Sequence, residues 1–77
     1  MNKKLVIRIN RVIGQAQGVK NMLESNRDCI EILQQIIAVR AGLSSLGREL
    51  VRTESESCAM EKNTERLRRV IDLVVKM

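Results

Sequence analysis

Apolar residues in the first third of the chain recur at the spacing of one face of an α-helix. Apart from the adjacent pair Val12 and Ile13, they follow one another at spacings of three or four residues, at Leu5, Ile9, Val12, Ile13, Ala16, Val19 and Leu23. This is the period of an amphipathic helix that buries one side. Polar residues repeat with the same period on another face, at Lys4, Arg8, Arg11 and Gln15. We therefore predict a helix over about residues 3–24 with one apolar and one basic face.

The strongest pattern follows a polar turn at residues 25–28. Apolar residues, here called the seam, alternate at spacings of three and four at Cys29, Ile32, Ile36, Val39, Leu43, Leu46 and Leu50. A flanking stripe adds Ile30, Leu33, Ile37 and Ala41. A heptad seam with a second stripe indicates a helix covered on two sides, by the first helix and by a partner chain. We place it at about residues 27–58 with Ser25 or Asn26 as N-cap, although the pattern also allows an end near Ser55.

A third, short helix is predicted over about residues 64–76. Its apolar face consists of Leu67, Val70, Ile71 and Val74. Because no segment alternates like a strand, we expect an all-α protein with a single domain over residues 1–77. A chain of 77 residues rarely buries enough apolar surface to be stable alone. We therefore expect it to oligomerise.

Positive charge is concentrated at the start of the chain. The net charge is +5, and residues 1–23 contain five bases and no acid. A local cationic helix suits a polyanion, either nucleic acid or an anionic membrane surface. Neither a secretory signal nor an apolar run of membrane-spanning length is apparent in the pattern. We therefore expect a cytoplasmic protein that binds no membrane and whose cysteines are thiols.

Several residue types are missing altogether, and their absence excludes classes of function. The chain has no His, Phe, Tyr, Trp or Pro. Histidine metal sites and Ser-His or Cys-His catalysis are excluded, as are the aromatic platforms on which single strands stack. With no catalytic constellation in the sequence, we expect no enzyme.

The two cysteines are placed for a site between chains. Cys29 lies near a helix start, where the dipole favours a thiolate, but its place on the seam disfavours charge. In one continuous helix Cys29 and Cys58 would be about 43 Å apart. Two copies of this helix could instead pack antiparallel and cross between Leu43 and Ser44. This crossing would bring Cys29 of one chain near Cys58 of the other, and it falls within the cluster of small residues at 41–47. We hypothesise an inter-subunit dithiol; the alternative is that both are small buried apolar residues.

Three segments of the chain resemble the CsoR/RcnR family of small bacterial repressors. They are residues 8–15 (Arg-Ile-Asn-Arg-Val-Ile-Gly-Gln), residues 27–29 (Arg-Asp-Cys) and residues 33–41. The resemblance covers roughly residues 4–60. It implies a three-helix protomer, an antiparallel four-helix-bundle homodimer and a disc-shaped dimer of dimers. It also implies repression of transcription and release of double-stranded operator DNA when an effector binds. The DNA-binding positions that it implies are Lys4, Arg8, Arg11, Gln15 and Lys20, with Arg48 and Arg52 as weaker additions.

The resemblance also implies an effector site between subunits. Copper(I)-binding members use Cys, His and Cys, and the matching positions here are Cys29, Glu54 and Cys58. Carboxylate is a poor copper(I) ligand, so we expect Glu54 to be a solvated helix residue and at most an accessory group. A CstR-like branch keeps only the two cysteines and senses sulfane sulfur, meaning persulfides and polysulfides. Without His, a nickel or cobalt site is disfavoured.

Our reading is a cytoplasmic, homotetrameric repressor that senses sulfane sulfur through Cys29 and Cys58, with no cofactor and no favoured metal. One alternative is a copper(I)-sensing repressor that uses the same two cysteines. Another is a basic helical module that binds a membrane or a partner protein. A third is a plain oligomerisation module with inert cysteines. Salt-dependent DNA binding and the effect of Cys29→Ala on regulation distinguish these readings.

Overall fold

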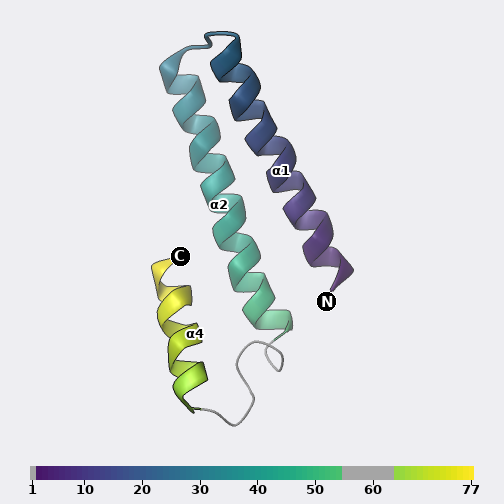
Figure 1. The fold of residues 1–77 in the computed structure, drawn as a ribbon, viewed down its shortest axis with the longest axis vertical. Coiled ribbons are helices and arrows are strands. Elements are labelled where there is room, and N and C mark those ends of the chain that lie inside the picture. The colour runs from purple at the N-terminus through teal and green to yellow at the C-terminus, as the bar shows by residue number, and fades with distance from the viewer. Residues whose placement is uncertain (1, 55–63) are drawn as a thin grey trace.

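The structure is a computed structural model that describes residues 2–54 and 64–77. In this part of the chain all regular structure is helical: α1 (Lys3–Glu24), α2 (Cys29–Thr53) and α4 (Thr64–Lys76). Helices α1 and α2 form an antiparallel hairpin, and α4 runs back along the C-terminal half of α2 (Figure 1). The all-α prediction is confirmed, and α1 and α4 have the predicted bounds.

The turn between α1 and α2 differs from the prediction at its cap. Asp28, not Ser25 or Asn26, is the N-cap of α2, because its Oδ2 accepts a hydrogen bond from the Ile30 N–H at 3.1 Å. Ser25 and Asn26 serve to end α1 instead. The Ser25 N–H donates to Asn21 O, and Asn26 adopts a left-handed conformation with φ 54°, which Asn tolerates better than most residues. Helix α2 therefore begins at Cys29.

Helix α2 ends at Thr53 with Glu54 as its C-cap, so of the two ends that the sequence pattern allowed, the one near Ser55 agrees with the structure and the continuation to residue 58 does not. Beyond Leu50 the next seam positions would be Thr53 and Ser57, which are polar and add no apolar contact to hold the helix. The Thr53 hydroxyl donates to Glu49 O at 2.8 Å, a local side-chain bond of the kind that competes with further helix. Cys58 lies outside the described residues.

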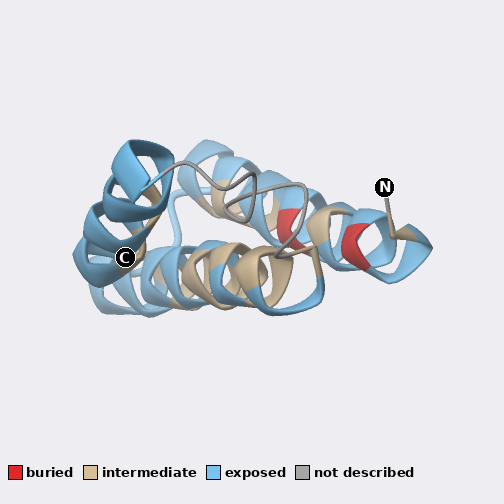
Figure 2. Cartoon of the chain, turned by 90° about the horizontal axis from the view of Figure 1, so that it is seen from below, coloured by how far each residue is buried: buried red, intermediate tan, exposed pale blue. Residues whose placement is uncertain are grey.

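The core between α1 and α2 is thin. Among the described residues only Leu5 and Val12, both on α1, are buried (Figure 2). The half-buried seam residues Leu46 and Leu50 of α2 line an apolar groove together with Leu5. At Gly42 an added Cβ would lie 3.0 Å from Val12 Cγ2, so the two backbones approach closely there. Part of the seam therefore faces α1, as predicted.

The flanking stripe of α2 has no cover within the described chain. Ile30, Leu33 and Ile37 are 65%, 52% and 65% exposed. Helix α4 reaches only the middle of α2, where the Ser44 hydroxyl donates to Met77 O at 3.0 Å. The outer face of the N-terminal half of α2 is therefore an unpartnered apolar surface.

By length and composition α2 could cross a membrane, which the sequence pattern did not lead us to expect. The core helix of a water-soluble protein meets the same criterion. Here α2 pairs with α1 and also carries Glu31, Arg40, Arg48, Glu49 and Arg52.

Candidate nucleic-acid interface and effector site

Three of the predicted DNA-binding residues line one groove between α1 and α2. Arg8, Arg11 and Gln15 of α1 form one wall, and Gly42 and Ser45 of α2 form the other, around a volume of about 190 Å³. We call this the basic groove. Arg8 Nη1 donates to Ser45 Oγ at 3.4 Å, a long bond to a neutral acceptor that does not itself neutralise the guanidinium charge. The small size of Gly42 keeps the groove open toward Gln15, whose Oε1 is 3.5 Å from the position of an added Cβ.

Two further cations gather beside the basic groove, around Glu49 of α2. Arg52 Nε and Nη2 donate to the Glu49 carboxylate at 3.1 and 2.5 Å. The Arg52 hydrogen bond is the largest effect on the pKa of Glu49 and holds it below its ordinary value. Desolvation, the second-largest effect, raises this pKa, and the charges of Arg52, Arg8 and Lys4 lower it. The same pairing raises the pKa of Arg52. Arg52 therefore pairs directly with the Glu49 carboxylate, and the charges of Arg8 and Lys4 also act on it.

The remaining two predicted DNA-binding residues lie differently. Lys20 follows Gln15 by five residues, which places it about 140° further around α1, so it does not belong to the face of the basic groove. Arg48 is exposed and lies between Ser45 and Arg52 along α2, so it flanks the groove. The structure thus brings together Lys4, Arg8, Arg11, Gln15 and Arg52, with Arg48 adjacent and Lys20 apart.

Cys29 is exposed and is the first residue of α2. Nothing within the described residues of one protomer buries Cys29, so the alternative of a buried apolar residue would require cover from another chain. Backbone N–H groups in the first turn of a helix have no partner within the helix. Arg27, before the cysteine, is paired with Glu31 at 3.0 Å and so does not present an uncompensated charge. The Cys29 side chain is therefore open to solvent in one protomer.

Glu54 lies at the other end of α2 from Cys29. It follows the helix as C-cap, is half-buried, and its Oε1 accepts a hydrogen bond from the Asn2 N–H at 3.2 Å. The expectation of a solvated helix residue is therefore wrong, because this bond ties Glu54 to the start of α1. Twenty-five residues separate Cys29 from Glu54, about 38 Å along a helix, so the two cannot meet within one chain.

The small-residue cluster has uses within the chain. Gly42 and Ser45 face α1 in the basic groove. On another side of α2, Ser44 bonds Met77, and an added Cβ on Gly47 would collide with the Met77 side chain. The close approaches that these residues allow are therefore made to α1 and α4, and the cluster no longer gives independent support to an inter-chain crossing point.

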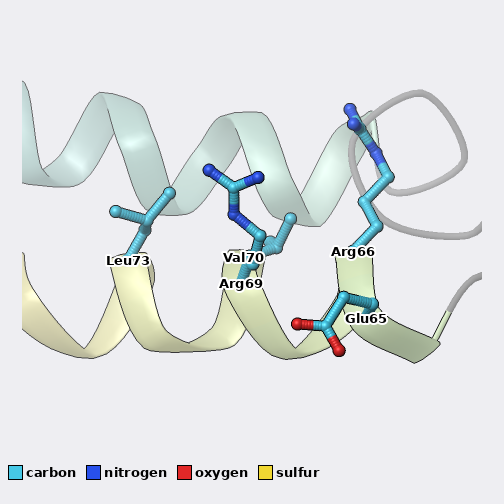
Figure 3. A pocket seen from close by; sticks show the side chains of 5 residues that line it. All are labelled: Glu65, Arg66, Arg69, Val70 and Leu73. Atoms are coloured by element: carbon cyan, nitrogen blue, oxygen red, sulfur yellow. The ribbon is translucent and has the colours of Figure 1, made fainter.

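Sequence reasoning missed Ser45 and Glu49, which contact the basic residues from α2. The available signal was their spacing of four residues, which places both on one helix face. It also missed a hollow of about 390 Å³ beside α4, lined by Glu65, Arg66, Arg69, Val70 and Leu73. In Figure 3 the Arg66 and Arg69 side chains extend from α4 toward α2.

Within residues 2–54 and 64–77, no three His, Cys, Asp or Glu side chains come together as a metal site would require.

Comparison with known proteins places this chain among repressors. The copper-sensing transcriptional repressor CsoR of Bacillus subtilis is 35% identical over 54 residues, which is 70% of this chain and 54% of that protein. The transcriptional repressor RcnR of Citrobacter koseri is 29% identical over 82 aligned positions, covering 96% of this chain and 91% of that protein. An uncharacterised Serratia marcescens protein is 46% identical over 44 residues, 57% of this chain and 48% of that protein. The chain thus spans about half the length of some relatives and nearly all of others.

No solved structure matches the chain. The family model described as metal-sensitive transcriptional repressor matches residues 1–76. This match covers α1, α2 and α4 of the described chain and both cysteines of the sequence. The chain belongs to the family of metal-sensitive transcriptional repressors.

Proposed function

We propose that this chain is a cytoplasmic repressor that holds double-stranded operator DNA with its basic groove and releases it when an effector acts on Cys29 and Cys58. The observation that carries the DNA contact is the convergence of Arg8, Arg11 and Gln15 on one groove. Arginine guanidinium groups bind phosphate strongly, and glutamine can read base edges. With no aromatic residue in the chain, phosphate contacts and groove shape carry most of the recognition.

A comparison of the DNA affinities of the Arg8→Ala and Lys20→Ala variants tests this contact. Each substitution removes one positive charge, but only Arg8 lies in the basic groove. Anisotropy of a labelled duplex, selected by the protein from a random pool, gives the affinity across a salt series. We expect Arg8→Ala to weaken binding about tenfold and to reduce the slope of log affinity against log salt by about one per lost phosphate contact. Lys20→Ala should change the affinity less than threefold. Equal losses in the two variants would contradict the proposal.

We propose a homodimer and homotetramer as the functional state. The support is the thin core, with two buried residues in the described chain, and the exposed flanking stripe of α2. A partner that covers Ile30, Leu33 and Ile37 would add the apolar burial that one protomer lacks. An antiparallel dimer would also allow an effector site to combine Cys29 of one subunit with Cys58 of its neighbour.

For the effector we propose sulfane sulfur, because two thiols suffice for its chemistry. The Cys29 thiolate attacks the outer sulfur of a persulfide, forms a Cys29 persulfide and releases the remaining thiol. The Cys58 thiol of the neighbouring subunit then attacks the inner sulfur, forms a disulfide and releases hydrogen sulfide. If both cysteines first become persulfides, the product is a trisulfide with loss of one hydrogen sulfide. The exposure of Cys29 supports the first step.

Copper(I) is the second candidate, favoured by the similarity to a copper-sensing repressor. Two thiolates can bind copper(I), a soft ion, without a third ligand. Intact-mass analysis of the reduced protein after polysulfide treatment, beside anaerobic copper(I) titration against a chelator, separates the two effectors. A covalent dimer that abolishes DNA binding supports sulfane sulfur. Stoichiometric copper(I) binding that releases DNA, with no covalent dimer after polysulfide, supports copper.

A further inference from the structure

One acidic side chain lies among the cations of the proposed DNA-binding face. Glu49 follows Ser45 by one helical turn, and its side chain is 26% exposed. Its carboxylate accepts both hydrogen bonds from Arg52, and Lys4 and Arg8 are close enough to act on its charge. Arg52, by contrast, is 72% exposed, so its guanidinium lies at the surface where a phosphate would approach.

A carboxylate and a phosphate compete for the same guanidinium groups. Arg52 uses two donors in a side-by-side pair with Glu49, the geometry in which arginine also holds phosphate. The negative charge of Glu49 also repels a phosphate placed within the Debye length, about 8 Å at physiological ionic strength. Ser45, which contacts Arg8 nearby, is neutral and imposes no such penalty.

We propose that Glu49 limits the affinity of this chain for DNA by neutralising part of the cationic surface formed by Lys4, Arg8 and Arg52. This inference rests on the proposed DNA contact of the basic groove. Its consequence for regulation is direct. If Glu49 lowers the affinity of the repressor for DNA, the effector has to weaken binding by a smaller factor before the repressor leaves the operator.

A positioning role for Glu49 predicts the opposite result. If Glu49 served to orient Arg52 toward a phosphate, its loss would free a long side chain and weaken DNA binding. The sign of the change in affinity therefore separates the two roles.

The test is Glu49→Gln, which removes the charge and keeps the shape and an acceptor oxygen. The matched control is Glu31→Gln, which removes the same charge from the exposed Arg27–Glu31 pair at the start of α2, about 27 Å away along the helix. With a labelled duplex across a salt series, we expect Glu49→Gln to bind roughly threefold to tenfold more tightly with a steeper salt slope. Glu31→Gln should stay within about twofold of the unsubstituted chain, because its distance exceeds the screening length.

Unchanged or weaker binding by Glu49→Gln overturns the inference, as does an equal gain in Glu31→Gln, which would reflect net charge alone. Arg8→Ala, measured in parallel, separates this failure from that of the proposed function. If Arg8→Ala weakens DNA binding but Glu49→Gln does not tighten it, only the role of Glu49 is wrong. If Arg8→Ala binds DNA as well as the unsubstituted chain, the basic groove is not the contact surface and both proposals fail. Far-UV circular dichroism confirms that each variant retains its helices.

Discussion

Asp28 determines where α2 begins and therefore where Cys29 lies. Its carboxylate caps the helix through the Ile30 N–H, so the next residue, Cys29, occupies the first helical position and is exposed. Had Ser25 or Asn26 been the cap, Cys29 would lie further inside the helix. The position of the candidate effector thiol thus depends on one capping side chain.

Replacing Asp28 by Ala should therefore destabilise the protein by about 1 kcal/mol, the usual loss when a capping side chain is removed. Urea unfolding followed by circular dichroism at a fixed protein concentration gives the difference. Ser25→Ala is the control, because Ser25 ends α1 and its exposed hydroxyl bonds only Asn21 O in the structure. A larger loss in Ser25→Ala than in Asp28→Ala would place the cap where the sequence pattern suggested.

At the scale of elements, the sequence predicted α1, α2 and α4, and both ends of α1 and of α4, because apolar period is a strong signal over long segments. The C-terminal end of α2 was harder to predict from the sequence. Its seam stops at Leu50, and the polar residues that follow have no period by which to choose between an end and a continuation. The helix ends after Thr53, whose hydroxyl bonds Glu49 O, and this local contact is not visible in the apolar period. The partial burial of Glu54 was not predictable either, since it depends on a contact with Asn2, 52 residues away.

Close packing of α1 on α2 gives a prediction at the same scale. An added Cβ at Gly14 has no neighbour within 4 Å, whereas at Gly42 it would lie 3.0 Å from Val12. Gly14→Ala should stabilise the chain by up to about 1 kcal/mol through helix propensity. Gly42→Ala should lose that gain because Val12 must move. Thermal unfolding of both variants measures the order; a destabilised Gly14→Ala would show that another chain packs on that side of α1.

At the scale of the whole molecule, the described chain measures 51 × 25 × 13 Å and is too thin to enclose a large core. Apolar burial is small, and large apolar side chains remain exposed on all three helices. Such exposure is typical of a surface that another protein chain covers. The basic groove and the flanking stripe belong to the same hairpin, so self-association would fix the spacing between the basic grooves of neighbouring subunits.

Disrupting the flanking stripe should therefore reduce self-association. Ile37→Lys places a charge on a residue that is 65% exposed in one protomer, where a partner would have to bury it at a large cost. Val75→Lys on α4, at a residue 78% exposed and outside the flanking stripe, is the control. Analytical ultracentrifugation should show a shift to smaller species for Ile37→Lys only. The same association state for both variants would contradict a partner on this stripe.

The central claim is that DNA bound through the basic groove is released by chemistry at Cys29. The direct test is DNA affinity of the reduced protein before and after polysulfide or copper(I), measured for the unsubstituted chain and for Cys29→Ala. We predict that one of the two effectors weakens DNA binding of the unsubstituted chain by tenfold or more, about 1.4 kcal/mol of coupling free energy. Cys29→Ala should bind DNA equally well and show no response. Release of DNA from Cys29→Ala by the same effector would contradict the claim, as would a chain that binds no DNA before treatment.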